Sequence, residues 1–407
     1  MSKIIIVQGG QWGSEAKGAI ASYICNHEQV DIAVRTGATN AGHTAYFDGK
    51  PVVMQQLPVG WTNPDTDLVL GAGALIDPYI LAREVAEVET LTGRDIRGRL
   101  LVDHRAGVHL PEHKERSKQS GRHHAIGATG KGCSEALIDK IRLRGKGYQT
   151  FGMTEFANNY KVVDTVKALN DSFDGGAKIL LEGTQGQLLD LHLGPYPYTT
   201  HKQTGPAVWM AEAGLSPALP TDIVMVVRTY PIRVAGNSGP MPLEMTWPAL
   251  ARIINRKLEA VNSGPIVTEE SLAEFEYALS NVLRDVKFES EEAKLSEANK
   301  LALEQLSPEV VSDLRRLFEM TTVTRKLRRV ARIHWKTLHD SAKQIRPHRV
   351  ALTFMNYEFP EYWYRKPENG IPDGMKDYLK LVSDSCRAPI THVTFGPADE
   401  HVTAVGR

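Results

Sequence analysis

The feature of the sequence that most constrains its fold is an apolar run near the N-terminus that two glycines interrupt. Ile4–Val7 is short and rich in β-branched residues, Gly9 and Gly10 come soon after it, and apolar residues at helical spacing follow Glu15. This order predicts a strand, a glycine turn and a helix. Such a unit is the first half of a βαβ crossover, so we expect a parallel sheet whose functional groups gather beyond the strand ends.

Apolar segments of strand length recur along the chain and alternate with helical patterns such as Pro78–Val88. This alternation predicts an α/β protein with a mostly parallel, doubly wound central sheet. Residues 246–319 are charged and rich in Leu and Ala, which predicts a helical insertion within a single domain of residues 1–407. The segments predicted as further strands are Asp31–Val34, Leu68–Leu70, Leu100–Val102, Ile179–Leu181, Ile223–Val227, Val350–Phe354 and His392–Phe395.

Composition narrows the class of protein further. The 407 residues include 48 basic and 48 acidic side chains, so no overall charge attracts nucleic acid or an anionic membrane. The 3 cysteines are far apart and form no CxxC pair, which fits a reducing compartment. No apolar stretch approaches the roughly 20 residues that span a bilayer. We therefore expect a cytoplasmic protein that binds neither nucleic acid nor membrane.

Residues 9–18, GGQWGSEAKG, lie where the first predicted strand gives way to the first helix. Backbone N–H groups at such a turn can bind phosphate together with the helix N-terminus, and Lys17 would add a positive charge. The spacing departs from a Walker A sequence, because Ala16 stands where that motif has its second glycine. An ordinary tight turn is therefore an equal alternative from the spacing alone.

Three further segments combine small residues with groups that can bind a ligand. In TNAGHT, Asn40 offers a donor and an acceptor and His43 could donate a proton to an oxyanion, although a lone His is more often structural. The glycines around Thr129 in IGATGKG suit phosphate, and a plain loop is the alternative. Gln185 in LEGTQGQLLD follows a predicted strand, where open α/β sheets bind ligands.

Residues 321–332, TTVTRKLRRVAR, concentrate hydroxyls and cations. A charge run is most often a solvated helix face. Thr and other β-branched residues are poor helix formers, however, so we favour a loop that presents Arg325, Arg328 and Arg329 to carboxylate or phosphate groups. Nucleic-acid binding is the weaker interpretation, because the run lacks aromatic residues and the chain is neutral.

Taken together and in this order, the segments resemble the adenylosuccinate synthetase family. The resemblance implies a P-loop NTPase-like fold and a Mg²⁺-dependent carbon–nitrogen ligase that forms a homodimer. In this family a GTP γ-phosphoryl group is transferred to O6 of IMP, and the amine of L-aspartate then displaces it at C6. The matching segments are GGQWGSEAKG, TNAGHT, IGATGKG with DKIRLRG, EGTQGQLLD with YPYTT, RTYPIRVAG, TTVTRKLRRV and FGP.

The first departure from the family pattern lies at Ser14. In the usual motif QWGDEGKG an Asp at this position takes the N1 proton and binds Mg²⁺, whereas a hydroxyl is a far poorer base and carries no charge. Ser14 is smaller and can accept from the 2-amino group of a guanine nucleotide. The sequence thus resembles the phage-type branch, which converts dGMP to 2-amino-2′-deoxyadenylosuccinate for 2-aminoadenine DNA. We expect a water held by Ser14, or the incoming aspartate, to take the N1 proton.

The second departure is TFMN, residues 353–356, where the family recognises the guanine of GTP with TKxD. Phe354 replaces the Lys and Asn356 replaces the Asp. An Asn side chain can pair with N6 and N1 of adenine, as a carboxylate cannot, and Phe354 can stack on the base. The resemblance and this departure together imply ATP or dATP as the phosphoryl donor.

The resemblance carries the family's roles to matching positions of this chain. The implied catalytic residues are Ser14, Lys17, His43 and Gln185, and the implied metal contacts are Ser14 and Gly42. The implied acceptor-nucleotide residues are Ser14, Asn40, Thr129, Gln185, Leu189, Thr200 and Val234, with Arg142 or Arg144 of the second subunit in place of the family Arg that aligns with Leu143. The implied triphosphate residues are Gly13, Glu15, Lys17, Gly18, Gly42, His43, Thr44, Phe354, Asn356, Gly396 and Pro397. The implied aspartate-binding residues are Thr322, Val323, Thr324, Arg325, Arg328 and Arg329.

Two other functions stay open. An ordinary adenylosuccinate synthetase that uses IMP and GTP would have to tolerate both departures. A catalytically inactive nucleotide-binding regulatory protein is the alternative from another class. Such a protein would have no chemical reason to keep Lys17, His43, Gln185 and Arg325 together.

Overall fold

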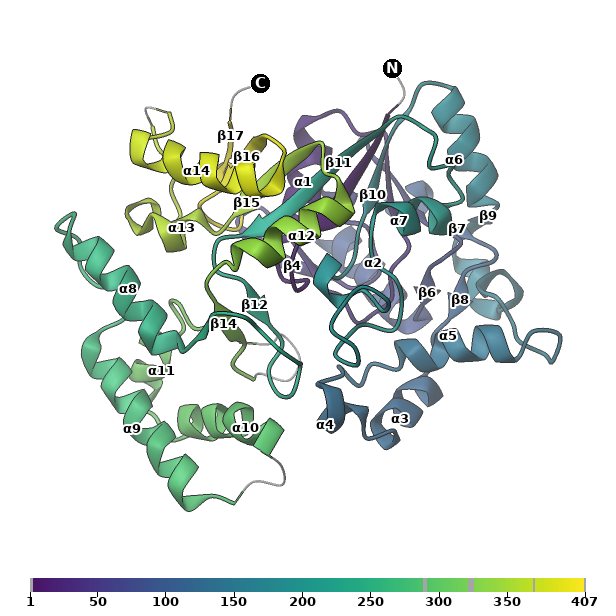
Figure 1. Cartoon of the computed structure of the whole chain (residues 1–407). Helices are drawn as coiled ribbons and strands as arrows, with labels where there is room; N and C mark the ends of the chain where they lie inside the picture. Colours follow the sequence, from purple (N-terminus) through teal and green to yellow (C-terminus); the bar gives the residue numbers. More distant parts are fainter. Residues whose placement is uncertain (1–2, 288–290, 321–325, 369, 406–407) are drawn as a thin grey trace.

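A 10-stranded sheet organises the chain (Figure 1). The computed structural model describes residues 3–287, 291–320, 326–368 and 370–405. Neighbouring strands of this sheet pair in parallel, except that β17 pairs antiparallel with β16 at one edge. The predicted α/β class with a mostly parallel central sheet is thereby confirmed. In spatial order the strands are β17 (Val402–Ala404), β16 (Ile390–Thr394), β15 (Arg349–Thr353), β11 (Thr221–Arg228), β1 (Lys3–Gly9), β10 (Lys178–Glu182), β2 (Ile32–Arg35), β5 (Asp67–Leu70), β7 (Leu100–Asp103) and β9 (Lys161–Val163).

Helices pack on both faces of the sheet, as a doubly wound arrangement requires. The helices on these faces are α1 (Lys17–His27), α2 (Pro78–Thr92), α6 (Thr165–Asp174), α7 (Pro206–Ala213), α12 (Trp335–Ile345) and α14 (Asp373–Cys386). Four other helices lie in the connections between the strands: α3 (Pro111–Gln119), α4 (Arg122–Ile126), α5 (Cys133–Arg142) and α13 (Met355–Glu358). Smaller sheets join β3 (His43–Phe47) to β4 (Lys50–Met54), β6 (Leu75–Ile76) to β8 (Gly107–Val108), and β14 (Arg329–Ala331) to β12 (Ile232–Arg233) and β13 (Glu244–Met245).

Strand β1 shows why the apolar runs of the sequence become central strands. Successive side chains of a strand point to opposite faces. Ile5 and Val7 pack into a core cluster with α1 and α2, whereas Ile4 and Ile6 pack into another cluster with α6 and α7. Because both faces are covered, the strand is apolar throughout and has no polar side.

Residues 246–319 hold four helices that lie together beside the central sheet (Figure 1). Their apolar faces enclose a separate hydrophobic cluster that includes Leu250 and Phe275, and Tyr230 and Tyr357 join it from the main part of the chain. That this insertion and the sheet form one domain stays a prediction. The four helices are α8 (Trp247–Glu259), α9 (Glu269–Asp285), α10 (Glu291–Glu304) and α11 (Pro308–Leu314).

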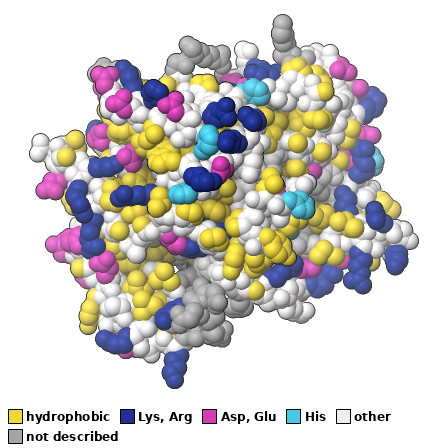
Figure 2. Space-filling model, in the orientation of Figure 1, with side chains coloured by type: hydrophobic (Ala, Val, Ile, Leu, Met, Phe, Trp, Pro, Cys, Tyr) yellow, Lys and Arg dark blue, Asp and Glu magenta, His cyan; other side chains and the backbone are white. Residues whose placement is uncertain are grey.

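The surface matches the balanced charge of the sequence. On the face drawn in Figure 2, basic and acidic side chains are interspersed, with apolar atoms between them. Within the described ranges, no helix has the length and apolar character needed to cross a membrane.

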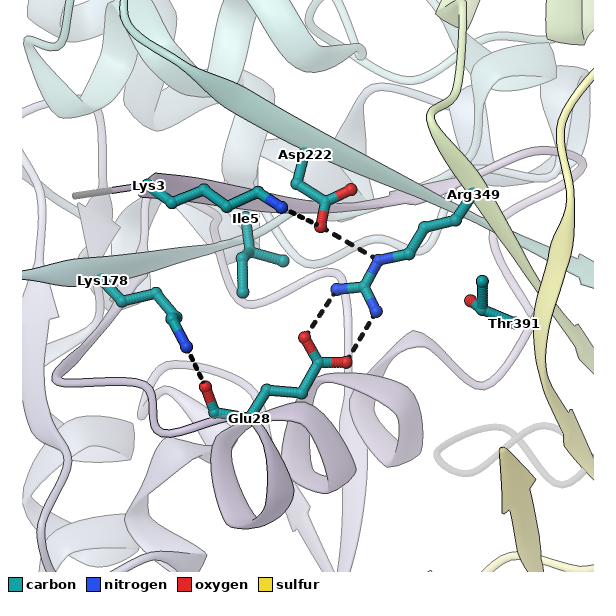
Figure 3. A pocket seen from close by; sticks show the side chains of 7 residues that line it. All are labelled: Lys3, Ile5, Glu28, Lys178, Asp222, Arg349 and Thr391. Atoms are coloured by element: carbon teal, nitrogen blue, oxygen red, sulfur yellow. Dashed lines mark hydrogen bonds and ion pairs between the residues drawn. The ribbon is translucent and has the colours of Figure 1, made fainter. Parts of the chain in front are cut away.

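Ion pairs link the amino ends of the central strands, whereas the candidate site lies at their carboxyl ends (Figure 3). Arg349 at the start of β15 donates to both carboxylate oxygens of Glu28 (2.6 and 2.8 Å), and its Nε lies 3.1 Å from Asp222. Lys3 pairs with Asp222 at 2.9 Å. These groups border a cavity of about 310 Å³. Their charges are paired with one another, so we interpret the cavity as a structural feature of the amino ends of these strands.

The substitution Glu28→Gln tests this ion-pair network. Burial opposes the charge on Glu28, but the hydrogen bonds and the charge of Arg349 outweigh it and hold the pKa of Glu28 below its ordinary value. A lowered folded-state pKa stabilises the fold above the unfolded pKa, and this stability is lost as the pH falls through the folded pKa. We expect the variant to lose about 1.5–3 kcal/mol of unfolding free energy at about pH 7, and less at about pH 3.5.

Urea unfolding of both proteins at the two pH values measures this difference. An equal loss of stability at both values would contradict the assignment to an ionised Glu28.

Candidate active site

The candidate site lies beyond the carboxyl ends of β1, β10, β11 and β15. The loops that follow β1 and β10 pack closely, because a side chain at Gly9 would come within 2.6 Å of the Gln185 carbonyl oxygen. Gly13 faces the backbone of Gln185 and the side chain of Leu189. Gln185 itself has a φ of 64°, which is rare for a residue with a side chain. The fold thus brings the predicted residues of both loops together.

Glu15 shapes the first loop from within. Its Oε1 accepts from the backbone N–H groups of Gln11 (3.1 Å) and Gly13 (2.7 Å), and its Oε2 pairs with Lys17 Nζ at 2.9 Å. Lys17 Nζ also donates to the Gly13 carbonyl. At the start of α1, Ala16 is left-handed and supplies no side-chain cap. The first-turn N–H groups of α1 are thus available to phosphate oxygens.

Glu182, the last residue of β10, is a buried carboxylate that binds groups from three other segments. Its oxygens accept from Arg35 Nη1 (2.9 Å) and from the Val59 N–H (2.5 Å), and Oε2 lies 3.1 Å from His43 Nδ1. Burial opposes the charge, but the hydrogen bond from His43 and the charge of Arg35 outweigh it and keep the pKa of Glu182 below its ordinary value. The ionised carboxylate therefore fixes the position of His43.

His43 is the neutral member of this group. Burial, together with the charge of Arg35, lowers the pKa of His43 from 6.5 to about 4. Because ionised Glu182 only accepts, the neutral ring carries its proton on Nδ1 and a lone pair on Nε2. Nε2 is buried and has no hydrogen-bond partner among the described residues. His43 must therefore gain a proton at Nε2 before it can donate one to an oxyanion.

The predicted acceptor-nucleotide residues come from loops that contact one another. The Arg233 guanidinium lies 4.2 Å from the Trp12 ring centre and donates to the Tyr198 carbonyl at 2.9 Å, so it joins the first loop to the YPYTT segment. The Thr200 N–H donates to the Leu189 carbonyl at 2.8 Å. Leu189 lies against Gly13, and Trp12 and Gly13 directly precede Ser14, so Thr200 and Arg233 are linked to the part of the first loop that contains Ser14.

The glycine-rich loop that contains Thr129 approaches the same side. A side chain at Gly127 would meet Asn237 and Ser238, which follow Val234 in the next loop. Asn237 Nδ2 also donates to the Ala125 carbonyl at 2.8 Å. Thr129 and Val234 therefore lie on touching loops. Asn40 precedes Ala41, whose carbonyl accepts from Arg35, so it is adjacent to the Glu182 group.

Arg142 and Arg144 differ from the other predicted acceptor residues. Both side chains are exposed at and just beyond the C-terminal end of α5. Arg144 Nε donates to the Ile141 carbonyl, and neither side chain bonds to another predicted acceptor residue. Their predicted contact from a second subunit stays a prediction.

Four of the predicted triphosphate-binding residues, Phe354, Asn356, Gly396 and Pro397, follow the ends of β15 and β16. Thr353 Oγ1 donates to the Glu15 carbonyl at 3.0 Å, which joins the end of β15 to the first loop. The Phe354 N–H donates to Thr394 Oγ1, the last residue of β16, and Gly396 and Pro397 follow soon after. Asn356 is 3% exposed, and its side-chain amide has no hydrogen-bond partner among the described residues.

A buried ionic cluster connects this side of the site to Ser14. The Arg228 guanidinium lies 3.5 Å from the Phe354 ring centre and forms a two-fold ion pair with Glu319. Tyr357 also donates to Glu319, at 2.9 Å. Arg328 Nη1 donates to Ser14 Oγ at 3.0 Å. The backbone N–H of Arg328 donates to the Glu319 carbonyl at 2.8 Å, so positions 14 and 354, where the chain departs from the family pattern, are connected through Arg328, Glu319 and Arg228.

Only part of the predicted aspartate-binding loop lies within the described residues. Thr322, Val323, Thr324 and Arg325 lie outside the described residues. Arg329 pairs with Glu244 and donates to Ser238 and Gly239, whereas Arg328 faces Ser14. The aspartate-binding role of both arginines stays a prediction.

Sequence reasoning missed several residues that build the site. Their side chains are ionic, and four of the five are buried. Three of them directly follow predicted strands, where an apolar pattern hides them, whereas Arg233 lies in the RTYPIRVAG segment and Glu319 ends the predicted helical insertion. The signal available was a charged residue at the end of an apolar run, which is costly unless it is paired. The residues are Arg35, Glu182, Arg228, Arg233 and Glu319.

The fold and the site together define a nucleotide-binding α/β enzyme. The sequence profile of the adenylosuccinate synthetase family matches residues 6–161 and 149–357. Adenylosuccinate synthetase of Thermococcus sibiricus is 37% identical over 243 residues, which are 59% of this chain and 69% of that protein. The enzyme of the same name from Methanococcus maripaludis strain C6 is 39% identical over 245 residues, with the same shares covered.

Solved structures extend the similarity over the rest of the chain. Succinoaminodeoxyadenylate synthetase of cyanophage S-2L, bound to dGMP and to dATP as energy donor, aligns with a TM-score of 0.72 at 26% identity and covers 99% of this chain and 95% of that one. Fully ligated adenylosuccinate synthetase of Plasmodium falciparum has the same TM-score at 18% identity, and this likeness concerns the fold alone. The chain belongs to the adenylosuccinate synthetase family, and it is a nucleotide-binding ligase of purine biosynthesis.

We predict that the His43 ring stays neutral, with its proton on Nδ1, from about pH 8 down to about pH 5. Long-range ¹H–¹⁵N NMR reads the protonation of both ring nitrogens, and loss of the signal in His43→Gln assigns it. In Glu182→Gln the amide can donate to Nδ1, so we expect the proton to move to Nε2. A wild-type titration midpoint near 6.5 would contradict the buried, neutral assignment.

Proposed function

We propose that this chain joins L-aspartate to C6 of dGMP with cleavage of ATP or dATP. The γ-phosphoryl group is transferred to O6 of the purine as the N1 proton leaves. The aspartate amine then attacks C6, phosphate departs, and the product is 2-amino-2′-deoxy-N6-succinyladenylate with ADP or dADP. The phage enzyme of similar fold, which binds dGMP and dATP, supports this substrate pair. The names of the archaeal relatives favour IMP and GTP, so ordinary adenylosuccinate synthesis is the competing function.

The observation that carries the proposal is the environment of Ser14. The family motif has a carboxylate at this position, whereas this chain has a neutral hydroxyl that accepts from Arg328. A guanine base carries a 2-amino group beside N1, and a short hydroxyl leaves room for that group and can accept from it. IMP has no such group, so the Ser14 oxygen would gain no comparable bond from hypoxanthine.

The donor side supports an adenine base. Asn356 is 3% exposed, and its side-chain amide forms no hydrogen bond among the described residues, so the amide is available to a ligand. Its carbonyl and NH₂ match the N6 donor and the N1 acceptor of adenine. The Phe354 ring lies under the Arg228 guanidinium and makes a T-shaped contact with Tyr357, yet it stays partly exposed, and we assign its exposed part to stacking on the base.

Adenylosuccinate synthetases in general use Mg²⁺. Among the described residues, no group of three or more His, Cys, Asp or Glu side chains could hold a metal ion. Ser14 is poorly suited as a ligand, because the Arg328 cation already donates to its oxygen. The chain fits an ion held mainly by substrate phosphates with the exposed Gly42 carbonyl as a protein ligand, as Mg²⁺ sites often are. When bound, Mg²⁺ neutralises charge on the phosphate oxygens.

The residues of the site have separate tasks in this reaction. Lys17 and the N-terminus of α1 bind phosphate oxygens, and Gln185 presents its amide to the acceptor base from the loop after β10. His43 takes up a proton at Nε2 as negative charge arrives, because that charge raises its pKa, and it then donates to the oxygen being phosphorylated. The N1 proton passes to a water held by Ser14 or to the incoming aspartate.

Phosphate release by the purified protein tests the proposal directly. dGMP, GMP and IMP are crossed as acceptors with ATP, dATP and GTP as donors, in Mg²⁺ and L-aspartate, and products are identified by mass. We expect turnover with dGMP and ATP or dATP at least ~10-fold above that with IMP and GTP. Preference for IMP and GTP would assign the ordinary reaction. Nucleotide binding without turnover of any pair would instead assign the inactive regulatory protein.

The substitution Asn356→Asp tests the donor base separately. A carboxylate accepts but cannot donate, so it loses the match to adenine and gains one to the N1–H and 2-amino group of guanine. We expect kcat/KM for ATP to fall ~10–100-fold and the preference to move toward GTP. Asn356→Ala is the matched control, because it weakens binding without favouring guanine. An unchanged ratio of ATP to GTP use in the Asp variant would contradict the assignment.

A further inference from the structure

The side chain of Arg328 occupies a position that aspartate binding does not explain. Its backbone N–H donates to the Glu319 carbonyl at 2.8 Å, and its Nε faces the Met320 carbonyl at 3.4 Å. Its Nη1 reaches Ser14 Oγ at 3.0 Å. These bonds direct the half-buried guanidinium toward the first loop, away from its neighbour Arg329, which pairs with Glu244. Arg328 thus joins the segment after the helical insertion to the loop that follows β1.

The charges around Arg328 do not balance. Glu319 is the nearby carboxylate, and it is bound by both Arg228 nitrogens and by the Tyr357 hydroxyl. Arg328 forms no ion pair with any described residue, and its side-chain partners are a neutral hydroxyl and a carbonyl. Glu319 is thus paired with Arg228, and the charge of Arg328 has no paired carboxylate of its own among the described residues. The cluster has an excess positive charge directly behind Ser14.

The bond from Arg328 also sets the orientation of the Ser14 hydroxyl. One lone pair of Oγ faces the guanidinium, so the hydroxyl hydrogen must point elsewhere. Ser14 then offers both a donor and a second lone pair to a ligand on the side away from Arg328. The O6 and N1 edge of a purine becomes electron-rich as its N1 proton leaves, and a hydroxyl donor backed by a positive charge complements that edge.

We propose that Arg328 is a positioning residue for the acceptor purine. Arg328 orients the Ser14 hydroxyl and places a positive charge next to it, and it is not a ligand of the aspartate substrate. This inference rests on the proposed function for its choice of acceptor. The Arg328–Ser14 bond carries it, because this bond puts a hydroxyl held by a cation where the family motif has a carboxylate.

A double-mutant cycle tests the proposal. Arg328→Gln and Ser14→Ala are each expected to lower kcat/KM for the acceptor nucleotide ~10–100-fold. If Arg328 acts through Ser14, the double variant is no more than ~2-fold worse than Ser14→Ala alone. The KM for aspartate should change less than ~3-fold in Arg328→Gln. The proposal would be overturned if the loss of acceptor kcat/KM in the double variant equalled the product of the two single losses. It would also be overturned if Arg328→Gln raised the KM for aspartate ~10-fold or more and left the acceptor kcat/KM unchanged.

Further variants separate this role from a merely structural one. Arg332 is an exposed guanidinium on the same segment, so Arg332→Gln removes an equal charge and should leave all constants unchanged. Arg328→Lys keeps the charge and should recover part of the acceptor kcat/KM. Thermal unfolding identifies any variant that fails to fold, and in that case Arg328→Lys takes the place of Arg328→Gln in the cycle. Lack of any recovery in a folded Arg328→Lys counts against a role of the charge.

The cycle is run with whichever acceptor the wild-type protein prefers. A wild-type preference for IMP sinks the proposed function but still permits coupling between the two residues. Additive losses sink the inference about Arg328 even when dGMP is the substrate.

Discussion

The buried carboxylate of Glu182 is the group on which the geometry of the site depends. It stands at the end of β10 and binds three groups: Arg35 of β2, His43 at the start of β3, and the Val59 N–H. Removing the carboxylate would leave a buried guanidinium unpaired, which costs about 3–5 kcal/mol in comparable settings. The same carboxylate keeps a proton on Nδ1 of His43 and leaves Nε2 to the ligand. One ion pair therefore fixes the strand ends and the chemistry at once.

The two departures from the family pattern are connected in the fold. Phe354 is stacked on Arg228, Arg228 pairs with Glu319, and the Glu319 carbonyl accepts from the backbone N–H of Arg328, whose side chain donates to Ser14. A carboxylate at position 14 would pair with Arg328. A change at position 14 therefore alters the charge next to the Arg228–Glu319 pair, which is a physical reason for positions 14 and 354 to depart from the family together.

Sequence patterns were sufficient for most of the central sheet, and insufficient for its short edge strands β9 and β17 and for the contacts between distant residues. Strands buried on both faces are continuous apolar runs, so β1, β10 and β11 were predictable within about one or two residues. The β3–β4 hairpin was not anticipated, because TNAGHT has the composition of a loop although β3 begins at His43. The Arg328–Ser14 bond joins residues 314 positions apart, and local periodicity carries no information about such pairs. The same limit hid Glu182 and Glu319, whose partners are identified by the fold.

The most direct test of this account is a competition between acceptors in one reaction. Equal amounts of dGMP and IMP are supplied to the wild-type protein with ATP, L-aspartate and Mg²⁺, and the two succinylated products are counted by mass. Their ratio equals the ratio of the kcat/KM values at any extent of early reaction. The account predicts at least ~10-fold more product from dGMP. A mixture dominated by the product of IMP would contradict it, and would show that a hydroxyl and a cation at this position serve the ordinary substrate.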